Sequence, residues 1–434
     1  MLSTNDKLPL SKSKRIGIFA KSALKIAAKH TAHSVSKTIG LSSKEEALHL
    51  TEVAQEAFKS LSKLRGTALK AAQLLSQETP FLPPEIKAVF GQACYQAPAL
   101  NRAVVRKVIL TDFKVEPETL FSEFNTHAFA AASIGQVHKG KTKEGQSIAI
   151  KIQYPGIRNT IESDMEILDL LLLKLPLPGI EKQRAFFKTS LKELKTRFIE
   201  ECDYQQEAAH ATLFSQTNFD PNIVISRPLA ALCSDSVLTT TFLDGLPLEA
   251  WLKTQPSQTH RNQIGQLIWN FFISNFIKNG LFHADPNPGN YLVLSDNRLG
   301  VVDFGCIKKV APSFPKELQT VLNAHLNLDI KPVLSIYTKW GIIPKDTAQD
   351  PATLEAAIHP FRTWLTLPFQ DETFDFNEHS DYIGTRFIES LKTAMTAVEN
   401  TTSDFVMFDR TYVGIMSLLI KLKAKVRMRN LIKF

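Results

Sequence analysis

The chain carries the sequence FHADPNPGNYLVLSDNRLGVVDFG at residues 282–305. In this stretch a carboxylate residue, Asp285, is followed after four intervening residues by an amide residue, Asn290. Two short apolar runs joined by a polar turn then lead to Asp303. If these runs pair as strands, Asn290 comes close to Asp303. Because Mg²⁺ prefers carboxylate, amide and phosphate oxygens, the stretch predicts a magnesium site formed by Asn290 and Asp303, with the carboxylate of Asp285 beside it.

This order of residues matches the catalytic loop and magnesium motif of kinases, H-R-D-x-x-x-x-N followed by D-F-G. Phosphoryl transfer requires positioned charge around ATP and metal more than covalent chemistry. We therefore predict ATP and Mg²⁺ as cofactors, Asp285 as the base or nucleophile-orienting carboxylate, and Asn290 and Asp303 as metal ligands. The plainer alternative is a helix, a loop and a hairpin with a solvated turn.

The same region departs from ordinary kinases. The loop reads His283-Ala284-Asp285 and so lacks the arginine that pairs with a phosphorylated activation loop. No A-P-E motif follows Gly305. Both absences argue against regulated protein phosphorylation. We expect His283 to have a structural role rather than to transfer protons.

A strand that carries a lysine precedes this region. Residues 147–152 read SIAIKI, alternate as a strand does, and place Lys151 in the V-A-I-K pattern, where it would hold the α- and β-phosphates. One hairpin earlier, the run AAASIG stands where a glycine-rich nucleotide loop is expected. An alanine run is also common packing material, and alanines restrict the backbone where glycines would free it. We nevertheless predict that the nucleotide-contacting residues of this loop are Ala130, Ala131, Ala132 and Ser133.

Two further elements complete the predicted nucleotide site. The run VLTTTFLDG at 237–245 is rich in β-formers and ends in a glycine turn, so we assign its residues Thr241, Phe242 and Leu243 to the hinge that contacts adenine. A helical pattern from about Phe186 to Phe214 contains Glu207, the candidate ion-pair partner of Lys151. Acidic residues on helices are mostly solvated, so spacing alone does not decide this assignment.

From about Leu64 to Gly305 the chain resembles the UbiB/ADCK family of atypical kinase-like proteins. The motifs that carry the resemblance are RGTALKAAQ at 65–73, FAAASIGQVH at 129–138, KIQYPG at 151–156, ECDYQQEA at 201–208, and the Asp285 and Asp303 loops. The resemblance implies a protein-kinase-like fold preceded by family-specific helices. It also implies ATP binding, use of Mg²⁺, and support of coenzyme Q (ubiquinone) or related prenyl-lipid biosynthesis.

Carried over by residue, the resemblance makes Lys151 the phosphate-binding lysine and Glu207 its ion-pair partner. Glu201 and Asp203 match the family's E-x-D pair, which we count among the nucleotide-site residues.

Lys70 and Gln73 match the family's K-x-G-Q motif, whose lysine reaches into the nucleotide pocket. They are three residues apart, so they share one face of a helix. The glycine of this motif is Ala72 here. Alanine favours a helix over glycine by up to about 1 kcal/mol, but its methyl group could crowd a close approach to the pocket. The effect of Ala72 therefore stays open.

The expected fold class is α+β: a two-lobed kinase-like fold with a small β-rich N-lobe, a helical C-lobe and an N-terminal helical extension. We place a basic amphipathic segment at 1–40, the extension at 41–125, the N-lobe at 126–241 and the C-lobe at 242–434. Within the C-lobe we expect a loop from Thr366 to Asp381. No stretch is long and apolar enough to predict a transmembrane span.

The net charge of +8 is concentrated near the ends of the chain. Residues 7–37 contain eight lysine or arginine residues and no acid, with apolar residues at helical spacing between them. Such a helix can lie on an anionic membrane surface or act as a mitochondrial transit peptide, and a solvated basic tail is the alternative. We expect a cytoplasmic protein that can bind a membrane peripherally, with a mitochondrial location as the alternative. The four cysteines show no C-x-x-C pattern, which favours a reducing compartment.

Two functions from different classes follow. The first is an ATPase or a small-molecule or lipid kinase, whose partners besides the nucleotide would be an anionic membrane and a prenyl-phenol lipid or its biosynthetic enzymes. The second is a nucleotide-binding pseudokinase that scaffolds a membrane-associated complex without turnover. Nucleic acid is not an expected partner, because the chain has no reader motif and no aromatic residues interleaved with its charge.

Overall fold

The computed structural model describes residues 43–64, 100–132, 134–170, 184–217, 220–343, 351–384 and 402–429, together with a few isolated positions before residue 90. Of the predicted basic segment 1–40 it describes only Gly17 and Lys25. Three predicted site residues lie outside the described residues: Lys70, Gln73 and Ser133.

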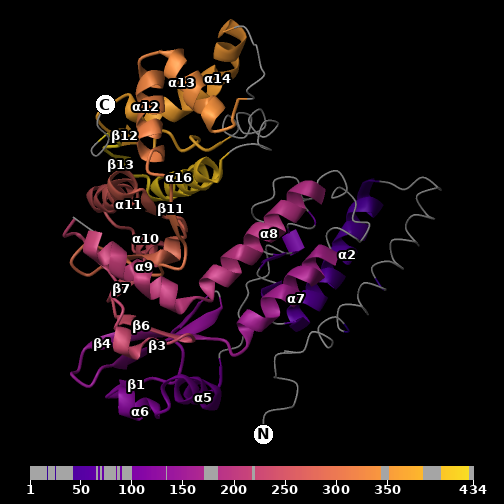
Figure 1. The fold of residues 1–434 in the computed structure, drawn as a ribbon, viewed down its shortest axis with the longest axis vertical. Helices are drawn as coiled ribbons and strands as arrows, with labels where there is room; N and C mark the ends of the chain where they lie inside the picture. The colour runs from indigo at the N-terminus through magenta and orange to yellow at the C-terminus, as the bar shows by residue number, and fades with distance from the viewer. Residues whose placement is uncertain are drawn as a thin grey trace. The chain divides into compact units, whose positions relative to one another are not determined.

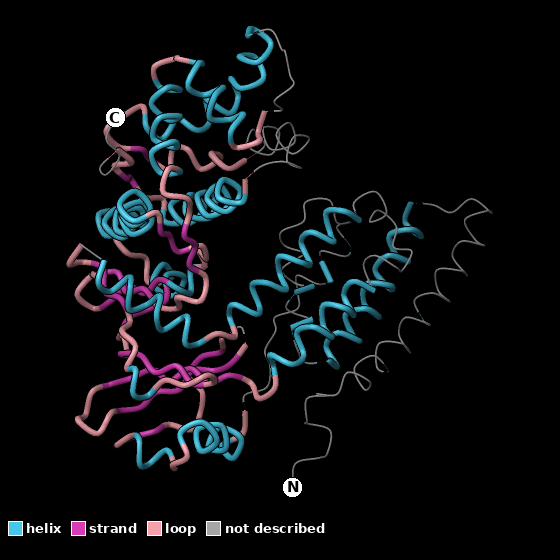
Figure 2. The backbone as a smooth tube through the Cα atoms, viewed as in Figure 1, coloured by secondary structure: helices cyan, strands magenta, loops and turns pink. Residues whose placement is uncertain are grey.

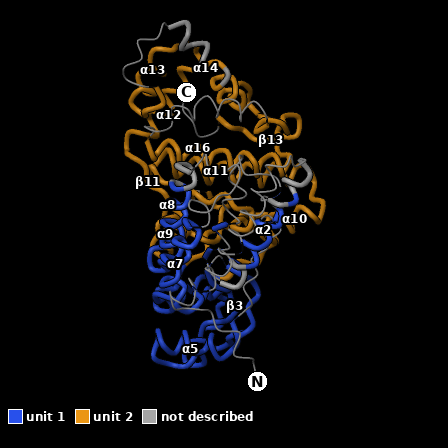
Figure 3. The backbone as a smooth tube through the Cα atoms, turned by 90° about the vertical axis from the view of Figure 1, so that its right-hand side faces the viewer, with its two compact units in different colours: residues 1–206, 228–241 blue, residues 207–227, 242–434 orange. Residues whose placement is uncertain are grey.

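The chain divides into two compact units, coloured separately in Figure 3. The first contains residues 1–206 and 228–241, and the second contains residues 207–227 and 242–434. The longer segment of the second unit, residues 242–434, has the bounds predicted for the C-lobe. The unit also includes residues 207–227, which were predicted to lie in the N-lobe.

The described helices that lie wholly in the first unit are α2 (Ser43–Leu64), α5 (Arg102–Phe113), α6 (Pro117–Leu120), α7 (Ile157–Asp169) and α8 (Arg184–Glu201), as labelled in Figure 1. A buried carboxylate joins α7 to the chain that follows α2. Asp164, on α7, has no exposed surface, and its Oδ2 accepts hydrogen bonds from the Thr67 hydroxyl at 2.7 Å and the Ala68 backbone N–H at 3.2 Å. Two donors satisfy this buried acceptor, so the contact orders the helical layer.

The sheet of the first unit contains β1 (Glu123–Phe124), β2 (Ala130–Ala131), β3 (Gly135–Lys141), β4 (Ser147–Gln153) and β6 (Val237–Thr241). Its order is β1-β3-β4-β6, with β2 paired to β3 as well, and the long β3–β4 hairpin is visible in Figure 2. Alternate residues of β4 are buried against α5, because Ile148, Ile150 and Ile152 have no exposed surface. The other face of β4 carries Ala149 and Lys151, which are only partly buried.

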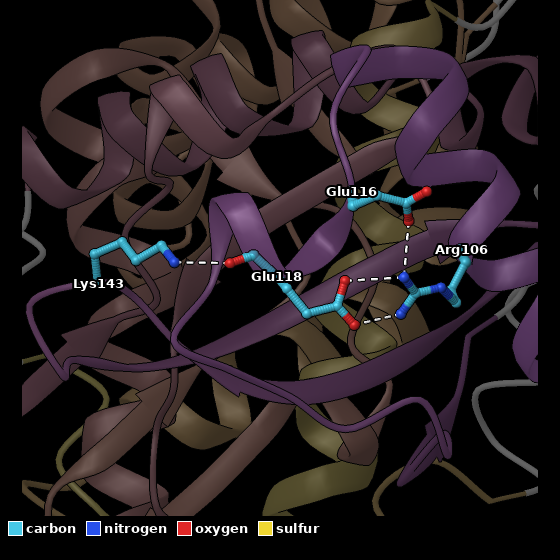
Figure 4. A network of polar contacts seen from close by, with 4 residues as sticks. All are labelled: Arg106, Glu116, Glu118 and Lys143. Carbon is cyan, nitrogen blue, oxygen red and sulfur yellow. Dashed lines mark hydrogen bonds and ion pairs between the residues drawn. The ribbon is translucent and has the colours of Figure 1, made fainter.

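A surface network anchors α5 and α6 to this sheet (Figure 4). The Arg106 guanidinium contacts the carboxylates of Glu116 and Glu118, and the Lys143 amine donates to the Glu118 carbonyl at 2.7 Å. The carboxylate of Glu118 raises the pKa of Arg106, and the reciprocal hydrogen bond lowers the pKa of Glu118. Exposed ion pairs of this kind contribute little to the stability of a fold, because solvent screens their charges. The network therefore orients α6 more than it stabilises the unit.

The second unit is mostly helical. Its described helices are α9 (Tyr204–Thr217, of which residues 207–217 belong here), α10 (Leu248–Lys253), α11 (Gln258–Asn279), α12 (Phe314–Leu326), α13 (Ile330–Lys339), α14 (Pro351–Thr366) and α16 (Ser403–Leu422). Helices α11 and α16 pack together in its core (Figure 1). Between them the tilted rings of Phe276 and Phe408 have centroids 4.4 Å apart.

Three small sheets complete the second unit. The largest has the order β5-β10-β9-β7 and consists of β5 (Ile223–Ile225), β7 (Gly245–Pro247), β9 (Tyr291–Leu294) and β10 (Leu299–Val301). The other two are pairs: β8 (Leu281–His283) with β11 (Ile307–Lys309), and β12 (Phe374–Asp375) with β13 (Lys425–Val426). Short 3₁₀ turns lie at Ala230–Leu232 in the first unit and at Pro288–Asn290 and Leu367–Phe369 in the second.

Two sequence predictions about local structure need correction. The helical pattern from Phe186 to Phe214 is interrupted between α8 and α9, because the Asp203 carboxylate accepts from the Gln206 N–H at 2.9 Å and so begins a new helix. The expected loop from Thr366 to Asp381 contains a 3₁₀ turn and the strand β12, whose partner β13 lies near the end of the chain. The described residues contain no helix long and apolar enough to cross a membrane.

Candidate functional site

The loop between β8 and β9 brings Asp285 and Asn290 into contact. The Nδ2 atom of Asn290 donates to Asp285 Oδ2 at 2.8 Å and to the Asp285 carbonyl at 3.2 Å. Asn287 supports the turn by accepting from the Gly289 N–H at 2.9 Å. A carboxylate can only accept, so the amide group that faces Asp285 is the NH₂. The Oδ1 atom of Asn290 accordingly points elsewhere.

The β9–β10 hairpin brings Asn290 to Asp303, as the sequence predicts. Tyr291 pairs with Val301, and the Val302 N–H donates to the Asn290 carbonyl at 3.0 Å. The two predicted metal ligands therefore lie at the same end of one hairpin. Their donor set, an amide oxygen and a carboxylate, fits Mg²⁺, which completes its coordination with phosphate and water oxygens.

His283 joins the two halves of this site. Its Nε2 atom lies 2.6 Å from the Asp303 carbonyl oxygen, and its Nδ1 atom accepts from the Asp285 N–H at 3.3 Å. These partners require a proton on Nε2 and none on Nδ1, which is one tautomer of the neutral imidazole. The ring is 2% exposed and lies against Phe304, with centroids 5.5 Å apart. His283 thus connects both carboxylate-bearing segments through their backbone.

The Asp303-Phe304-Gly305 motif is held by its own backbone geometry and by α9. Asp303 adopts a left-handed φ of 66°, and its Oδ1 accepts from the Gly305 N–H at 3.2 Å. Asp is one of the few residues that tolerates this conformation. The Phe304 peptide contacts two side chains of α9: its N–H donates to Glu207 Oε1 at 3.4 Å, and its carbonyl lies 3.2 Å from His210 Nδ1.

Glu207 is buried, although most acidic residues on helices are solvated. The side chain is 4% exposed, and one of its carboxylate oxygens accepts from the backbone of the Asp303-Phe304-Gly305 motif. Glu207 belongs to the second compact unit and Lys151 to the first, so their predicted ion pair stays a prediction.

Lys151 lies on the more open face of the first unit's sheet. Its direct neighbours across the strands are Val137 on β3 and Leu238 on β6. Directly opposed residues in antiparallel strands share a face. On this face the Lys151 amine lies 5.2 Å from the centroid of the Tyr204 ring, and Gln153 donates to the Cys202 carbonyl at 2.8 Å.

The predicted E-x-D residues flank that contact. Glu201 is the last residue of α8, and Asp203 caps α9, as described above. Burial raises the pKa of the Cys202 thiol to about 11, and the neighbouring Glu201 carboxylate adds to the shift. The structure therefore brings Glu201 and Asp203 near the end of β4, two residues beyond Lys151.

The alanine run forms a hairpin with β3. Ala130 pairs with Val137, which places Ala130 on the face of Lys151, whereas Ala131 pairs with Gln136 on the opposite face. The Ala132 N–H donates to the Gly135 carbonyl at 2.9 Å, so Ala132 is on the Lys151 face again. Ala130 and Ala131 thus form the strand β2, and the hydrogen bond of Ala132 continues its pairing with β3, so the run is not a free loop.

The hinge prediction divides between the two units. Thr241 pairs with Ile148, which places its side chain toward α5, while Phe242 and Leu243 begin the second part of the second unit. The neighbouring Thr240 pairs with Ala149 and shares the face of Lys151. Any contact from Thr241 to a ligand on that face would therefore use its backbone.

A buried polar chain that was not predicted from the sequence lies behind this face. Gln136 and His138 are 1% and 0% exposed. Gln136 accepts from the Leu100 N–H at 2.7 Å and lies 2.9 Å from His138 Nε2, while His138 Nδ1 lies 2.9 Å from the Asn125 carbonyl. Burial lowers the pKa of His138. The alternation G-Q-V-H is the signal that could have found these residues, since polar residues on the core face of a strand require partners.

These observations agree with the comparisons to known proteins. The ABC1 atypical kinase-like domain matches residues 94–337, more than half of the chain. The chain therefore belongs to the ABC1 atypical kinase-like family, and the predicted α+β kinase-like fold and family resemblance are confirmed.

Several curated proteins are similar over most of the chain. Atypical kinase COQ8B, mitochondrial, of Rattus norvegicus is 30% identical over 340 residues, which cover 76% of this chain and 63% of that protein. Atypical kinase COQ8, mitochondrial, of Saccharomyces cerevisiae is 28% identical, covering 74% and 63%. The probable serine/threonine-protein kinase abkA of Dictyostelium discoideum is 27% identical, covering 79% and 64%. The chain thus spans less than two thirds of the length of these relatives.

A solved structure shows the same fold. The complex of Rv3197 with erythromycin from Mycobacterium tuberculosis aligns with a TM-score of 0.61 over 90% of this chain and 97% of that one. At 24% sequence identity, this likeness concerns the fold alone.

Proposed function

We propose that this protein binds Mg·ATP and turns it over, as an ATPase or as a kinase of a small molecule or lipid, in support of ubiquinone or related prenyl-lipid biosynthesis. The observation that carries the proposal is the arrangement of three side chains in the second unit. Asp285 is held by Asn290, and a backbone hydrogen bond joins Asn290 to the residue before Asp303. Membership of an atypical kinase-like family supports the same chemistry.

In this proposal each residue has a defined task. The Asp303 carboxylate and the Asn290 Oδ1 atom hold Mg²⁺, which neutralises charge on the phosphates. Asp285 orients the attacking hydroxyl or water and accepts its proton. Its Oδ2 already accepts from Asn290, so Oδ1 is the atom aimed at the nucleophile. Lys151 contacts the phosphates from the first unit's sheet.

The competing function is a pseudokinase that binds nucleotide and scaffolds a membrane-associated complex. The feature that favours it is the alanine run, because Ala130 and Ala132 direct methyl groups to the face of Lys151 where glycines would leave space. The ordered Asp285–Asn290 contact favours turnover, because a scaffold has no need of an oriented carboxylate.

Membrane and pathway roles are proposed on separate grounds. The mitochondrial relatives are named COQ8 and COQ8B, and the basic segment 7–37 suits an anionic surface. A prenyl-phenol lipid or its biosynthetic enzymes are the partners we propose. A mitochondrial location, the alternative given from the sequence, agrees with the names of these relatives, so we propose it ahead of the cytoplasmic one.

A phosphate-release assay separates the two functions. Wild-type protein should release phosphate from Mg·ATP, more rapidly with anionic vesicles or a phenolic head-group analogue. Asp285→Asn should lose turnover by at least about a hundredfold but keep nucleotide binding in a thermal-shift assay. Asp296→Asn is the matched control, since Asp296 is an exposed carboxylate in the β9–β10 turn, paired with Arg298. Binding without turnover in the wild type, under every condition, would support the scaffold instead.

A further inference from the structure

Helix α16 approaches the Asp285 loop at one glycine. A Cβ atom placed on Gly414 would lie 2.1 Å from Pro286 Cγ, 3.0 Å from Pro286 Cβ and 3.5 Å from Pro286 Cδ. All three nearest atoms belong to the same proline ring. Real Cβ atoms do not approach other atoms within 3.0 Å, so only glycine permits this packing.

The helix is fixed on both sides of this contact. Phe408, before Gly414, packs among the rings of α11 and α12, and Ile415 and Met416, directly after it, have no exposed surface. Asp404, in the first turn, accepts from the Ala311 N–H at 2.9 Å. A helix held in this way cannot move aside, so any added atom at Gly414 must displace Pro286 instead.

Displacement of Pro286 would move Asp285. The two residues are adjacent, and the proline ring fixes its own φ, so the loop is stiff at this point. Asp285 also bonds to His283 through its N–H and to Asn290 through its carboxylate. The backbone of α16 at Gly414 is therefore the surface against which Pro286, the residue next to Asp285, is seated.

We propose that Gly414 is a positioning residue for Asp285: it seats Pro286 and so sets the place of the carboxylate that orients the nucleophile. This inference rests on the proposed function for its kinetic consequence but not for its structural one. Glycine in a helix interior is less favourable than alanine, and α16 nevertheless holds one where an added Cβ would meet the Pro286 ring.

The test compares Gly414→Ala with Gly265→Ala in the full chain. Gly265 is a matched control because it lies inside α11, and its added Cβ would meet Ala424 Cβ at 2.6 Å, away from the Asp285 loop. Both changes add one methyl group to a crowded helix of the same unit. We expect Gly414→Ala to lower kcat for Mg·ATP by about 10- to 100-fold, the range associated with a displacement of about 1 Å, with unchanged nucleotide affinity. Gly265→Ala should retain kcat.

Hydrogen exchange provides a readout that is independent of turnover. Gly414→Ala should speed exchange of the Asp285, Asn290 and Val302 amides, whose acceptors are His283 Nδ1, the Asn287 carbonyl and the Asn290 carbonyl. Gly265→Ala should leave these amides unchanged. If the wild type shows no turnover but the exchange result holds, the proposed function is wrong, whereas the inference that Gly414 positions the Asp285 loop is supported.

A double-mutant cycle with Pro286→Ala decides whether the proline ring transmits the effect. In the chain that keeps Pro286, Gly414→Ala should lower kcat at least tenfold. In the Pro286→Ala background, which lacks the Cγ and Cδ atoms that the added methyl group would meet, it should lower kcat less than threefold. Equal losses in both backgrounds, or unchanged exchange at the three amides, would overturn the proposal. If Gly414→Ala does not fold, Pro286→Ala alone becomes the test. It must then speed exchange at Asp285 and lower kcat, and unchanged values would overturn the proposal equally.

Discussion

The Nε2 atom of His283 lies 2.6 Å from the backbone carbonyl oxygen of Asp303. Through this bond one neutral imidazole joins the predicted catalytic carboxylate segment to the predicted metal-binding segment, because its other nitrogen accepts from the Asp285 N–H. The ring uses both nitrogens for backbone contacts, so it has none left for proton transfer. This geometry supports a structural role for His283 rather than a role in proton transfer.

The first prediction concerns the metal. Asp303→Asn should abolish the Mg²⁺-dependent part of nucleotide binding, because it removes the only charged ligand that we assign. Thermal shift with ATP, with and without Mg²⁺, measures this effect. Because the Asn side chain can still accept from the Gly305 N–H, the turn should survive and the ligand-free melting temperature should change little. An undiminished Mg²⁺-dependent shift would show that the metal site lies elsewhere.

The second prediction concerns the alanine run. Ala131→Gly and Ala132→Gly both free the backbone, but only Ala132→Gly removes a methyl group from the face of Lys151. We expect both to change the relative affinities for ATP and ADP or the turnover, with the larger change for Ala132→Gly. Parallel nucleotide titrations and rate measurements decide the matter. Identical behaviour of both variants and the wild type would mean that the run serves only for packing.

The third prediction concerns pH. Burial lowers the pKa of His138 in the folded protein, so the unfolded chain binds the proton more readily. His138 therefore contributes stability that is present above the unfolded pKa of about 6.5 and is lost progressively as the pH falls from there through the lower folded pKa. Melting temperatures of the wild type and His138→Gln at pH 7.5 and 5.5 check this.

The difference in melting temperature between the wild type and His138→Gln should be smaller at pH 5.5 than at pH 7.5. Burial also lowers the pKa of His325, to about 4, so His325 should destabilise both proteins alike on acidification and cancel from their difference. If wild type and variant lose the same number of degrees on acidification, His138 is not the responsible group.

The fourth prediction concerns the membrane. A chain of residues 41–434 should keep nucleotide binding but lose association with vesicles that contain cardiolipin or phosphatidylglycerol. Each lysine near an anionic surface contributes roughly 1 kcal/mol, and the attraction weakens with salt. Co-sedimentation at low and high salt is the measurement. If the shortened chain pellets as well as the full one, the basic residues from Lys421 to Lys433 are the next candidates for the anchor.

The sequence by itself determined the local parts of the site. The strands around Asn290 and Asp303 were predictable because a short polar turn joins them, so the pairing is a neighbour interaction along the chain. The place of Lys151 within a strand was predictable for a similar reason, since alternation reports which residues face a core. Family membership followed from motifs that can be read in order.

Only the tertiary structure decided which distant residues support those parts. Glu207 and His210 reach the Phe304 peptide from 97 and 94 residues away, and Gly414 meets Pro286 from another helix. Spacing could not reveal these contacts, because helix periodicity shows which residues share a face but not what that face meets. A glycine in a helix and a histidine on its surface become meaningful only when folding brings a proline ring or a peptide carbonyl against them.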